Sequence, residues 1–427
     1  MRIRTAVVDA DLGAATTLSV GYDYRKNRSK GVTWGTYPVF YDDASFLGWP
    51  RGFSSAADWS YWNTTATATA FADLKHPFGN GWMLRALAGQ RATDGDMALF
   101  YVYGFSNRAT GETLVPSAYR SRDRGRQNMR DVYASGPFQA SGRAHELVLG
   151  MSGSRYSKTS RVNAAEALAP IGDVLQWNGD YPSPQFAANA DKVTDIRRKT
   201  VPCAGLIYAI TPVYSAFVGY TEIFDPQDNR RRDGSFLDPV LGSSREIGLK
   251  GRHLDGRLNT TLVLFDTRQD HVAEADVGKT LPDGLTQAYV AVDGTRSRGV
   301  ELDASGELSE DWSASFGWSH FAREGPDGAD LRTALPHRLL RVFSTYRLPG
   351  AWSRLSVGGG ANWQSASHAA VDGRNGPQRV DQASETLLGA MARYAFNAQA
   401  ALRACSRWSR SPALPKARRQ AFSAASR

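Results

Sequence analysis

The sequence predicts an all-β protein, an antiparallel transmembrane β-barrel. Three observations lead to this prediction. Apolar and polar residues alternate over many runs, as side chains do on the two faces of a strand. Short turns and long polar loops follow these runs in succession, which is typical of short periplasmic turns and long extracellular loops. No apolar run approaches the roughly 18 residues of a membrane helix, so strands would have to make the crossing.

The composition fits this fold class. Mean hydropathy is −0.40 and hydrophobic residues make up 42% of the chain, which is low, but a barrel with a polar lumen is only weakly hydrophobic along its sequence. The 11 Trp and 17 Tyr are enough to form aromatic belts at two bilayer interfaces. An aromatic-rich soluble β-sandwich is the alternative on pattern alone.

Most of the net positive charge lies in the last 25 residues of the chain. Of the formal net charge of +9, seven charges lie in residues 403–427, so 9 − 7 leaves only +2 for the rest of the chain. A nucleic-acid partner is therefore not expected. The two cysteines, Cys203 and Cys405, suggest neither a disulfide framework nor a zinc site.

The N-terminal half is predicted to contain hairpins separated by long loops. Residues 26–63 have no regular period and are expected to form an outer loop, residues 106–127 a polar loop, and residues 157–199 a further extracellular loop. Within the last, Asp191 to Lys199 is short, charged and unpatterned. The predicted strands are Ala6–Leu12, Thr16–Tyr24, Thr64–Leu74, Trp82–Gln90, Met97–Phe105, Asn128–Gly136 and His145–Tyr156.

The stretch from Thr200 to Gly251 carries the clearest pattern. It contains three strand-like runs, and in the middle one Tyr214, Ala216, Val218 and Tyr220 share one face, which suits lipid. Later strands alternate in the same way, and the total comes to roughly 16 strands against about 22 in plugged transporters. These later runs are Leu258–Thr267, Ser297–Leu308, Trp312–Ser319, Arg338–Leu348, Leu355–Trp363 and Leu388–Phe396.

Several strings in this part of the chain carry a resemblance. They are Tyr-Thr-Glu-Ile-Phe-Asp-Pro-Gln at 220–227, Asp-Gly at 233–234 with Leu237, Pro239 and Gly242, Glu-Ile-Gly-Leu-Lys-Gly at 246–251, and Arg-Gly-Val-Glu-Leu-Asp-Ala-Ser-Gly-Glu-Leu at 298–308. This segment resembles the barrel of TonB-dependent ferric-siderophore receptors of the ferric-coprogen and ferripyoverdine kind. The likeness extends more weakly from about Asp9 to Phe396.

The resemblance implies a function as well as a fold. It implies a transporter in the cell outer membrane rather than an enzyme, with outer-membrane lipid and a ferric siderophore as partners. Iron would be carried as the siderophore chelate, so neither a directly bound cofactor nor a metal site on the protein is expected. In an intact receptor of this kind, TonB–ExbB–ExbD would supply the energy for uptake.

The sequence also departs from the family pattern. The resemblance implies two more strands before residue 200, where Asp191 to Lys199 is unpatterned, so we expect a hairpin to be missing there. No signal peptide, TonB-contacting box or plug is recognisable, and the sequence after Phe396 lacks the terminal strand that such a receptor would have. We therefore expect residues 1–396 to form an incomplete barrel that does not transport by itself. Residues 397–427 are expected to be an aberrant basic tail, disordered or out of frame. A passive porin-like or structural outer-membrane barrel is the alternative.

Candidate ligand-binding residues lie in the predicted outer loops. Aromatic rings there offer rigid faces to an iron chelate, and arginines would attract an anionic one. The alternatives are that the rings pack on one another, and that the arginines are simply solvated or contact phosphates of the outer leaflet. The candidates are Trp34, Tyr37, Tyr41, Trp49, Trp59, Trp62, Arg122, Arg124, Trp177 and Tyr181. No catalytic constellation was found.

Overall fold

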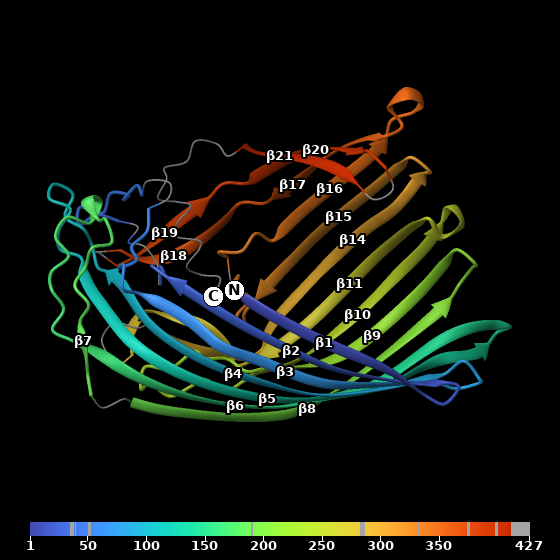
Figure 1. Ribbon diagram of the computed structural model, residues 1–427, viewed down its shortest axis with the longest axis horizontal. Helices are drawn as coiled ribbons and strands as arrows, with labels where there is room; N and C mark the ends of the chain where they lie inside the picture. Colours follow the sequence, from blue (N-terminus) through green and yellow to red (C-terminus); the bar gives the residue numbers. More distant parts are fainter. Residues whose placement is uncertain are drawn as a thin grey trace.

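The structure of the chain is a computed structural model (Figure 1). It describes residues 1–34, 38, 40–49, 53–188, 191–281, 287–331, 333–373, 376–397 and 400–410. Helix in these ranges is limited to three short 3₁₀ segments, η1 (Val174–Gln176), η2 (Leu254–Gly256) and η3 (Gly350–Trp352). No helix in the described part of the chain has the length and apolar character required to cross a membrane.

Almost everything else is one large antiparallel sheet. It has 17 strands, of which β7 (Gln185–Phe186) is a two-residue pairing, so 17 − 1 leaves 16 long strands in the described residues. The long strands are β1 (Arg2–Leu12), β2 (Thr16–Lys30), β3 (Tyr61–Pro77), β4 (Met83–Tyr103), β5 (Val115–Ala140), β6 (Arg143–Glu166), β8 (Asp191–Ala209), β9 (Tyr214–Asp225), β10 (Val240–His253), β11 (Leu258–Asp270), β14 (Thr295–Ser309), β15 (Trp312–Glu324), β16 (Arg338–Arg347), β17 (Leu355–Gln364), β20 (Glu385–Ala395) and β21 (Ala401–Arg410). Two separate hairpins, β12 (Val272–Thr280) with β13 (Gln287–Val292) and β18 (Ser367–Gly373) with β19 (Gly376–Gln382), complete the structure.

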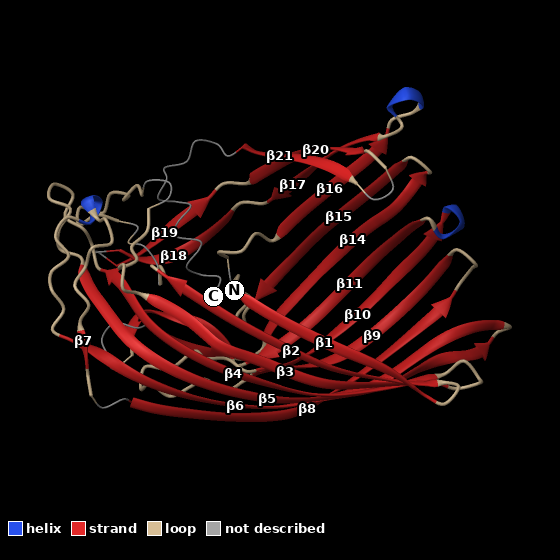
Figure 2. Cartoon of the chain, in the orientation of Figure 1, coloured by secondary structure: helices blue, strands red, loops and turns tan. Residues whose placement is uncertain are grey.

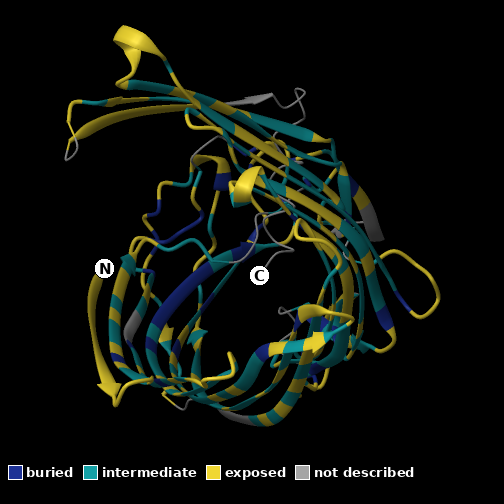
Figure 3. Cartoon of the chain, turned by 90° about the vertical axis from the view of Figure 1, so that its right-hand side faces the viewer, coloured by how far each residue is buried: buried dark blue, intermediate teal, exposed yellow. Residues whose placement is uncertain are grey.

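Each long strand pairs with the next one along the chain, so the sheet is an up-and-down meander. The same neighbour pairing continues from β11 through β14, β15, β16, β17 and β20 to β21. The sheet curls around a central axis (Figure 3). In the part of the chain that the structure describes, β1 pairs only with β2 and β21 only with β20. The predicted all-β antiparallel barrel architecture is confirmed.

The two faces of the sheet differ in chemistry. Val218, Ile247 and Leu264 lie directly opposite one another on β9, β10 and β11, and 46%, 55% and 52% of their surfaces are exposed. Glu246 and Lys250 alternate with the apolar residues of β10 and so project to the other face. We call the apolar face the outer face and the polar one the lumen face, because a membrane barrel turns apolar residues to lipid.

Glycines on the lumen face make room for aromatic rings on neighbouring strands. Phe217 lies opposite Gly248, and a Cβ atom placed on that glycine would overlap the ring. Phe71 and Gly21 form a second pair of this kind. Such aromatic–glycine pairs fix the register of curved sheets, so they help to set the pairing in the strands that form the barrel wall.

The structure corrects several predicted boundaries in the N-terminal half. β4 is one strand through residues 83–103, and β5 begins at Val115, so most of the predicted loop 106–127 is strand. Residues 191–199, expected to be unpatterned, form the first half of β8, whose pairing with β6 runs on without a break. A strand that extends beyond a membrane is solvated and needs no apolar residues there. Apolar alternation therefore could not reveal these extensions.

The end of the chain contributes one more strand. Ala401 to Arg410 form β21, which pairs with β20 from Thr386 to Ala395. The sheet therefore continues past residue 396, the expected boundary of the barrel. Residues 411–427 lie outside the described residues.

Candidate ligand-binding site at the long-loop end

The two ends of the barrel are built differently. Successive strands are joined by short turns at one end, for example residues 13–15 and 141–142, and by long segments at the other, such as residues 31–60 and 167–190. The described parts of these long segments gather together beyond the strand ends (Figure 2). The arrangement of short turns and long loops agrees with the prediction, and the long-loop end holds most of the predicted ligand-binding residues.

A hydrophobic cluster, which we call the loop core, joins these loops. Phe100 is fully buried in it, and Trp177 stacks on Phe100 with ring centroids 5.4 Å apart and an interplanar angle of 3°. Tyr181 and Trp59 also contact the ring of Phe100, at centroid distances of 4.6 Å and 6.0 Å. The buried members of the loop core are Leu47, Trp49, Ala57, Phe100, Val102, Leu114, Ala118, Val174 and Tyr181.

Hydrogen bonds fix the polar atoms of three of these rings, whereas the buried indole nitrogen of Trp59 has no hydrogen-bond partner among the described residues. The indole nitrogen Nε1 of Trp49 donates to the carbonyl of Pro38 at 2.8 Å, and that of Trp177 donates to the carbonyl of Ala56 at 3.1 Å. The hydroxyl of Tyr181 donates to the carbonyl of Ala169 at 2.6 Å. Burial raises the pKa of the Tyr181 hydroxyl, so it remains a donor at neutral pH.

Five of the predicted ligand-binding aromatics therefore form the scaffold of the loops, and one of them is Tyr41, which is partly buried against the loop core. Trp49 and Tyr181 are buried, and Trp59 and Trp177 are partly buried against the same cluster. The loop aromatics pack on one another, which was the alternative reading of their pattern. Their faces are mostly covered by neighbouring rings, so their main contribution is to hold the loops in place.

A second aromatic group remains half-buried, and we call it the aromatic trio: Trp34, Tyr101 and Tyr119. The ring of Trp34 meets those of Tyr101 and Tyr119 edge-on, at centroid distances of 4.7 Å and 5.0 Å. Alternation along β4 and β5 places both tyrosines on the same face as Asp131, which is the lumen face. Burial, followed by the charge of Asp123, raises the pKa of the Tyr119 hydroxyl. The trio thus offers ring edges and a neutral hydroxyl.

The other predicted aromatics lie apart from the trio. Tyr41 contacts the guanidinium group of Arg108, which lies 5.8 Å from its ring centroid. Trp62 is on β3 and is exposed over 36% of its surface, although it was predicted to lie in a loop. Tyr37 lies outside the described residues.

Arg122 and Arg124 lie on a strand and not in the loop where they were predicted. Both belong to β5, and both share the outer face with Val132 by alternation. Arg124 pairs with Asp94 on the neighbouring strand, with Nε and Oδ2 3.3 Å apart. The structure therefore does not bring these arginines together with the aromatic trio, which faces the lumen.

Tyr101 and Tyr119 are candidate site residues that the sequence reasoning missed. A signal for Tyr101 was present, because it lies in the predicted strand Met97–Phe105 among other aromatics. Tyr119 was hidden because its segment had been assigned to a loop. The spacing of Tyr101 and Tyr103 places both tyrosines on one face of a strand. This spacing would have indicated that they face the lumen.

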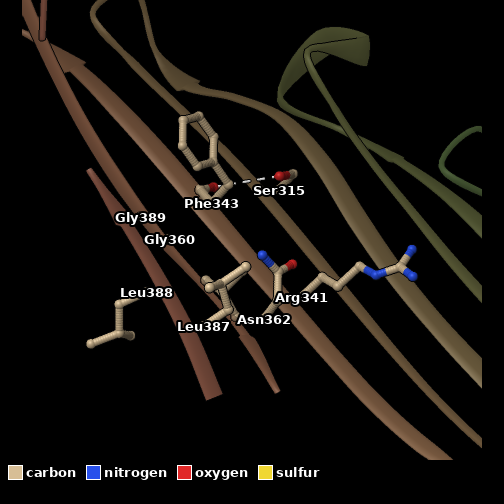
Figure 4. A pocket seen from close by; sticks show the side chains of 9 residues that line it. Ser315, Arg341, Phe343, Gly360, Asn362, Leu387, Leu388 and Gly389 are labelled. Carbon is tan, nitrogen blue, oxygen red and sulfur yellow. Dashed lines mark hydrogen bonds between the residues drawn. The ribbon is translucent and has the colours of Figure 1, made fainter. Parts of the chain in front are cut away.

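The lumen face also carries a shallow pocket of about 260 Å³ on β15, β16, β17 and β20 (Figure 4). The side chains of Arg341 and Asn362 and the ring of Phe343 line it, and Gly360 and Gly389 leave the space open. The hydroxyl of Ser315 donates to the carbonyl of Phe343 at 3.5 Å. This pocket lies within the barrel wall and contains none of the predicted ligand-binding residues.

The donor groups of the described residues do not gather into a metal centre. Within the ranges that the structure covers, no three His, Cys, Asp or Glu side chains come close enough to hold a metal ion.

Comparison with known families gives the identity of this architecture. The family described as TonB dependent receptor-like, beta-barrel, matches residues 4–408. The chain belongs to the TonB-dependent receptor family. Members of this family are transporters of the outer membrane and not enzymes. The predicted family is thereby confirmed.

Several relatives of this chain are named as ferric-siderophore receptors, which confirms the predicted resemblance. It is 30% identical to the ferripyoverdine receptor of Pseudomonas aeruginosa over 439 residues, which cover 91% of this chain and 53% of the relative. It is 29% identical to the ferric-pyoverdine 358 receptor of Pseudomonas putida, covering 92% of this chain and 54% of the relative. The chain thus spans about half the length of these curated relatives.

Solved structures agree with the sequence comparison. The pyoverdine outer membrane receptor of Pseudomonas aeruginosa bound to pyoverdine superposes with a TM-score of 0.76 at 28% identity, covering 93% of this chain and 64% of that structure. The alcaligin outer membrane receptor of Bordetella pertussis gives a TM-score of 0.53 at 28% identity, covering 96% of this chain and 65% of that structure.

Proposed function

We propose that this chain forms the barrel of an outer-membrane receptor that binds a ferric siderophore at its long-loop end. The observation that carries the proposal is the aromatic trio on the lumen face. Its tyrosines lie on β4 and β5, and its tryptophan lies in a loop that contributes to the loop core. Ring faces and edges bind a large chelate of mixed polarity through contact area. The relatives' names, which state ferripyoverdine and ferric pyoverdine as ligands, support the choice of chelate class.

A binding titration tests this proposal. The chain, refolded in detergent micelles, is titrated with ferripyoverdine and separately with iron-free pyoverdine in a calorimeter. We expect Trp34→Ala to weaken ferripyoverdine binding by about 3- to 10-fold, since an aromatic contact is worth roughly 0.5–1.5 kcal/mol. Trp312→Ala is the matched control, because Trp312 is 46% exposed at the start of β15, at the short-turn end.

The titration distinguishes a siderophore site at the trio from a porin-like barrel. Equal loss of affinity in both variants, or no heat of binding for the unchanged chain, would refute a siderophore site at the trio. Conductance through liposomes without any chelate binding would favour the porin-like barrel instead.

Transport is a separate part of the proposal. We infer that a receptor containing this barrel works with TonB–ExbB–ExbD, and that the 427 residues by themselves bind chelate without energy-driven uptake. Uptake of iron-55 by cells that make only this chain, at a rate above that of cells without it, would contradict the second statement.

A further inference from the structure

We propose that His145 is a pH-sensitive clamp that holds the short-turn ends of three neighbouring strands together. It lies near the start of β6, beside the turn at residues 141–142. When its imidazole is neutral, the ring links β6 to both β5 and β8, and when the ring gains a proton, the link to β8 breaks. The clamp is at the opposite end of the barrel from the aromatic trio, so it does not depend on the proposed siderophore site.

The hydrogen bonds of His145 require the neutral ring. The backbone N–H of Ala209 on β8 donates to Nδ1 at 3.1 Å, so Nδ1 carries no proton. Nε2 lies 2.9 Å from the carbonyl oxygen of Ala140 on β5, and because a carbonyl can only accept, Nε2 carries the proton. The two partners therefore select one neutral tautomer and leave no position for a second proton on the ring.

The bond from Ala209 continues the sheet beyond the point where the ladder between β6 and β8 ends. Paired residues of these two strands run only as far as Glu146 and Ile207, and Ala209 follows two residues later. On its other side Ala209 still pairs with Ser215 of β9. A buried backbone N–H needs an acceptor, and the imidazole of His145 supplies it where the ladder does not.

The surroundings of the ring make a positive charge unfavourable. His145 is 3% exposed on the outer face of β6. Its ring stacks on that of Tyr208 with centroids 4.1 Å apart, and the ring of Phe138 lies 5.4 Å away on the other side strand. A proton on Nδ1 would point at the N–H of Ala209, so two donors would face each other at a place that water does not reach.

The charged and titratable groups around the ring do not compensate for such a charge. β8 contributes the phenol of Tyr208, and β5 presents only the ring of Phe138 and a backbone carbonyl. On β6, Arg143 shares the face of the imidazole by alternation and would repel a second positive charge, whereas Glu146 projects to the lumen face. No acidic side chain among the described residues forms an ion pair with this imidazole.

Two other histidines at the short-turn end show the contrast. Nδ1 of His76 lies 2.7 Å from the hydroxyl oxygen of Thr16. Nε2 of His253 lies 3.0 Å from the hydroxyl oxygen of Thr260. A hydroxyl can donate to a neutral ring and accept from a charged one, so both contacts survive protonation. A backbone N–H can only donate, so of these three histidines His145 is the one that must change its bonding.

Acid should open the clamp and alkali should close it. Opening leaves Nδ1 free to take up a proton, so the open form binds more protons than the clamped form, and a falling pH favours it. Because imidazole gains its charge between about pH 5 and pH 8, the clamp should change state within this range.

Hydrogen exchange of the full chain in phosphatidylcholine vesicles tests the proposal. Exchange is followed at about pH 8 and about pH 5, the ends of the range in which imidazole titrates. Each rate is divided by that of the same amide in an unstructured peptide at the same pH, which gives a protection factor. We expect the protection of the Ala209 amide to fall by about 10-fold or more in acid, because a hydrogen bond is lost and a donor is left unpaired.

H145N is the deciding variant, because the side-chain oxygen of Asn can accept from the N–H of Ala209 in place of Nδ1 and never becomes charged. Its protection at Ala209 should be equal at the two pH values. H76N is the matched control, since it changes a histidine that is bonded to a hydroxyl, and it should keep the pH dependence of the unchanged chain.

Equal protection of Ala209 in the unchanged chain at both pH values would overturn the clamp, whatever the variants do. The same pH dependence in H145N as in the unchanged chain would also overturn it, because another group would then be responsible. If H145N fails to fold, NMR of the labelled His145 ring in the unchanged chain decides. Protonation of the ring should coincide with the loss of protection, and a ring that titrates at a different pH would contradict the proposal.

Discussion

At the scale of single residues, Phe100 decides whether the long loops have a fixed arrangement. Its side chain is fully buried between rings that come from two loops far apart in the sequence, including Trp59 and Trp177. Backbone groups within loops are usually solvated and mobile. The loop core replaces that mobility with packing, which allows the aromatic trio to be presented in one geometry.

Phe100→Ala should release the loops without unfolding the barrel. Removal of a buried Phe costs about 3–5 kcal/mol, which is enough to open a local unit of structure. Hydrogen exchange at residues 53–60 and 174–181 should then rise by at least about 100-fold, while the strand amides of β9 and β10 keep their protection.

Phe78→Ala is the control for this substitution, because Phe78 is 45% exposed beside a short turn. Unchanged exchange in the loops of the Phe100 variant would mean that the loop core does not hold them.

At the scale of elements, the aromatic–glycine pairs on the lumen face explain how neighbouring strands keep their register. A Cβ atom at Gly248 would lie 2.5 Å from the carbonyl oxygen of Leu262 and closer still to the ring of Phe217. The backbone contact cannot be relieved by a change of rotamer. We expect Gly248→Ala to destabilise the barrel by about 1–3 kcal/mol, the usual cost of overpacking.

Gly205→Ala is the matched control, since the nearest atoms to an added Cβ there are 3.8 Å away. Urea unfolding in phospholipid vesicles should show a lower midpoint for the Gly248 variant and an equal or higher one for the Gly205 variant. Equal urea midpoints for the two variants would contradict the conclusion that Gly248 is needed to make room for the ring of Phe217.

The elements also show what the sequence can and cannot predict. Strands that cross the membrane were predictable, because Tyr214 to Tyr220 and Trp312 to Ser319 alternate between lipid and lumen. The extension of β5 is absent from the prediction because a run of arginines in a polar segment predicts a solvated loop. Arg120, Arg122, Arg124 and Arg126 in fact recur with a period of two. The burial of Trp49 and Tyr181 depends on contacts between distant loops, which no local pattern encodes.

At the scale of the whole molecule, the sheet has an apolar outer face and a polar lumen face. Apolar side chains project outward in a belt, polar ones line the lumen, and the long loops stand at one end with their own core. Family membership accounts for this plan, and the chain shares it with receptors of which it spans about half the length. The proposed siderophore site follows from which face a strand residue occupies.

The difference between the outer face and the lumen face is tested most directly by measuring how accessible each residue of β9 is to lipid and to water. In a background with Cys203 and Cys405 replaced by Ser, single cysteines at residues 214–220 are spin-labelled in vesicles. Collision with oxygen, which concentrates in lipid, and with a water-soluble nickel complex is then recorded for each label. The account predicts a two-residue period, with Tyr214, Ala216, Val218 and Tyr220 reached by oxygen and the positions between them reached by nickel. Uniform access to nickel along the strand would contradict the membrane barrel.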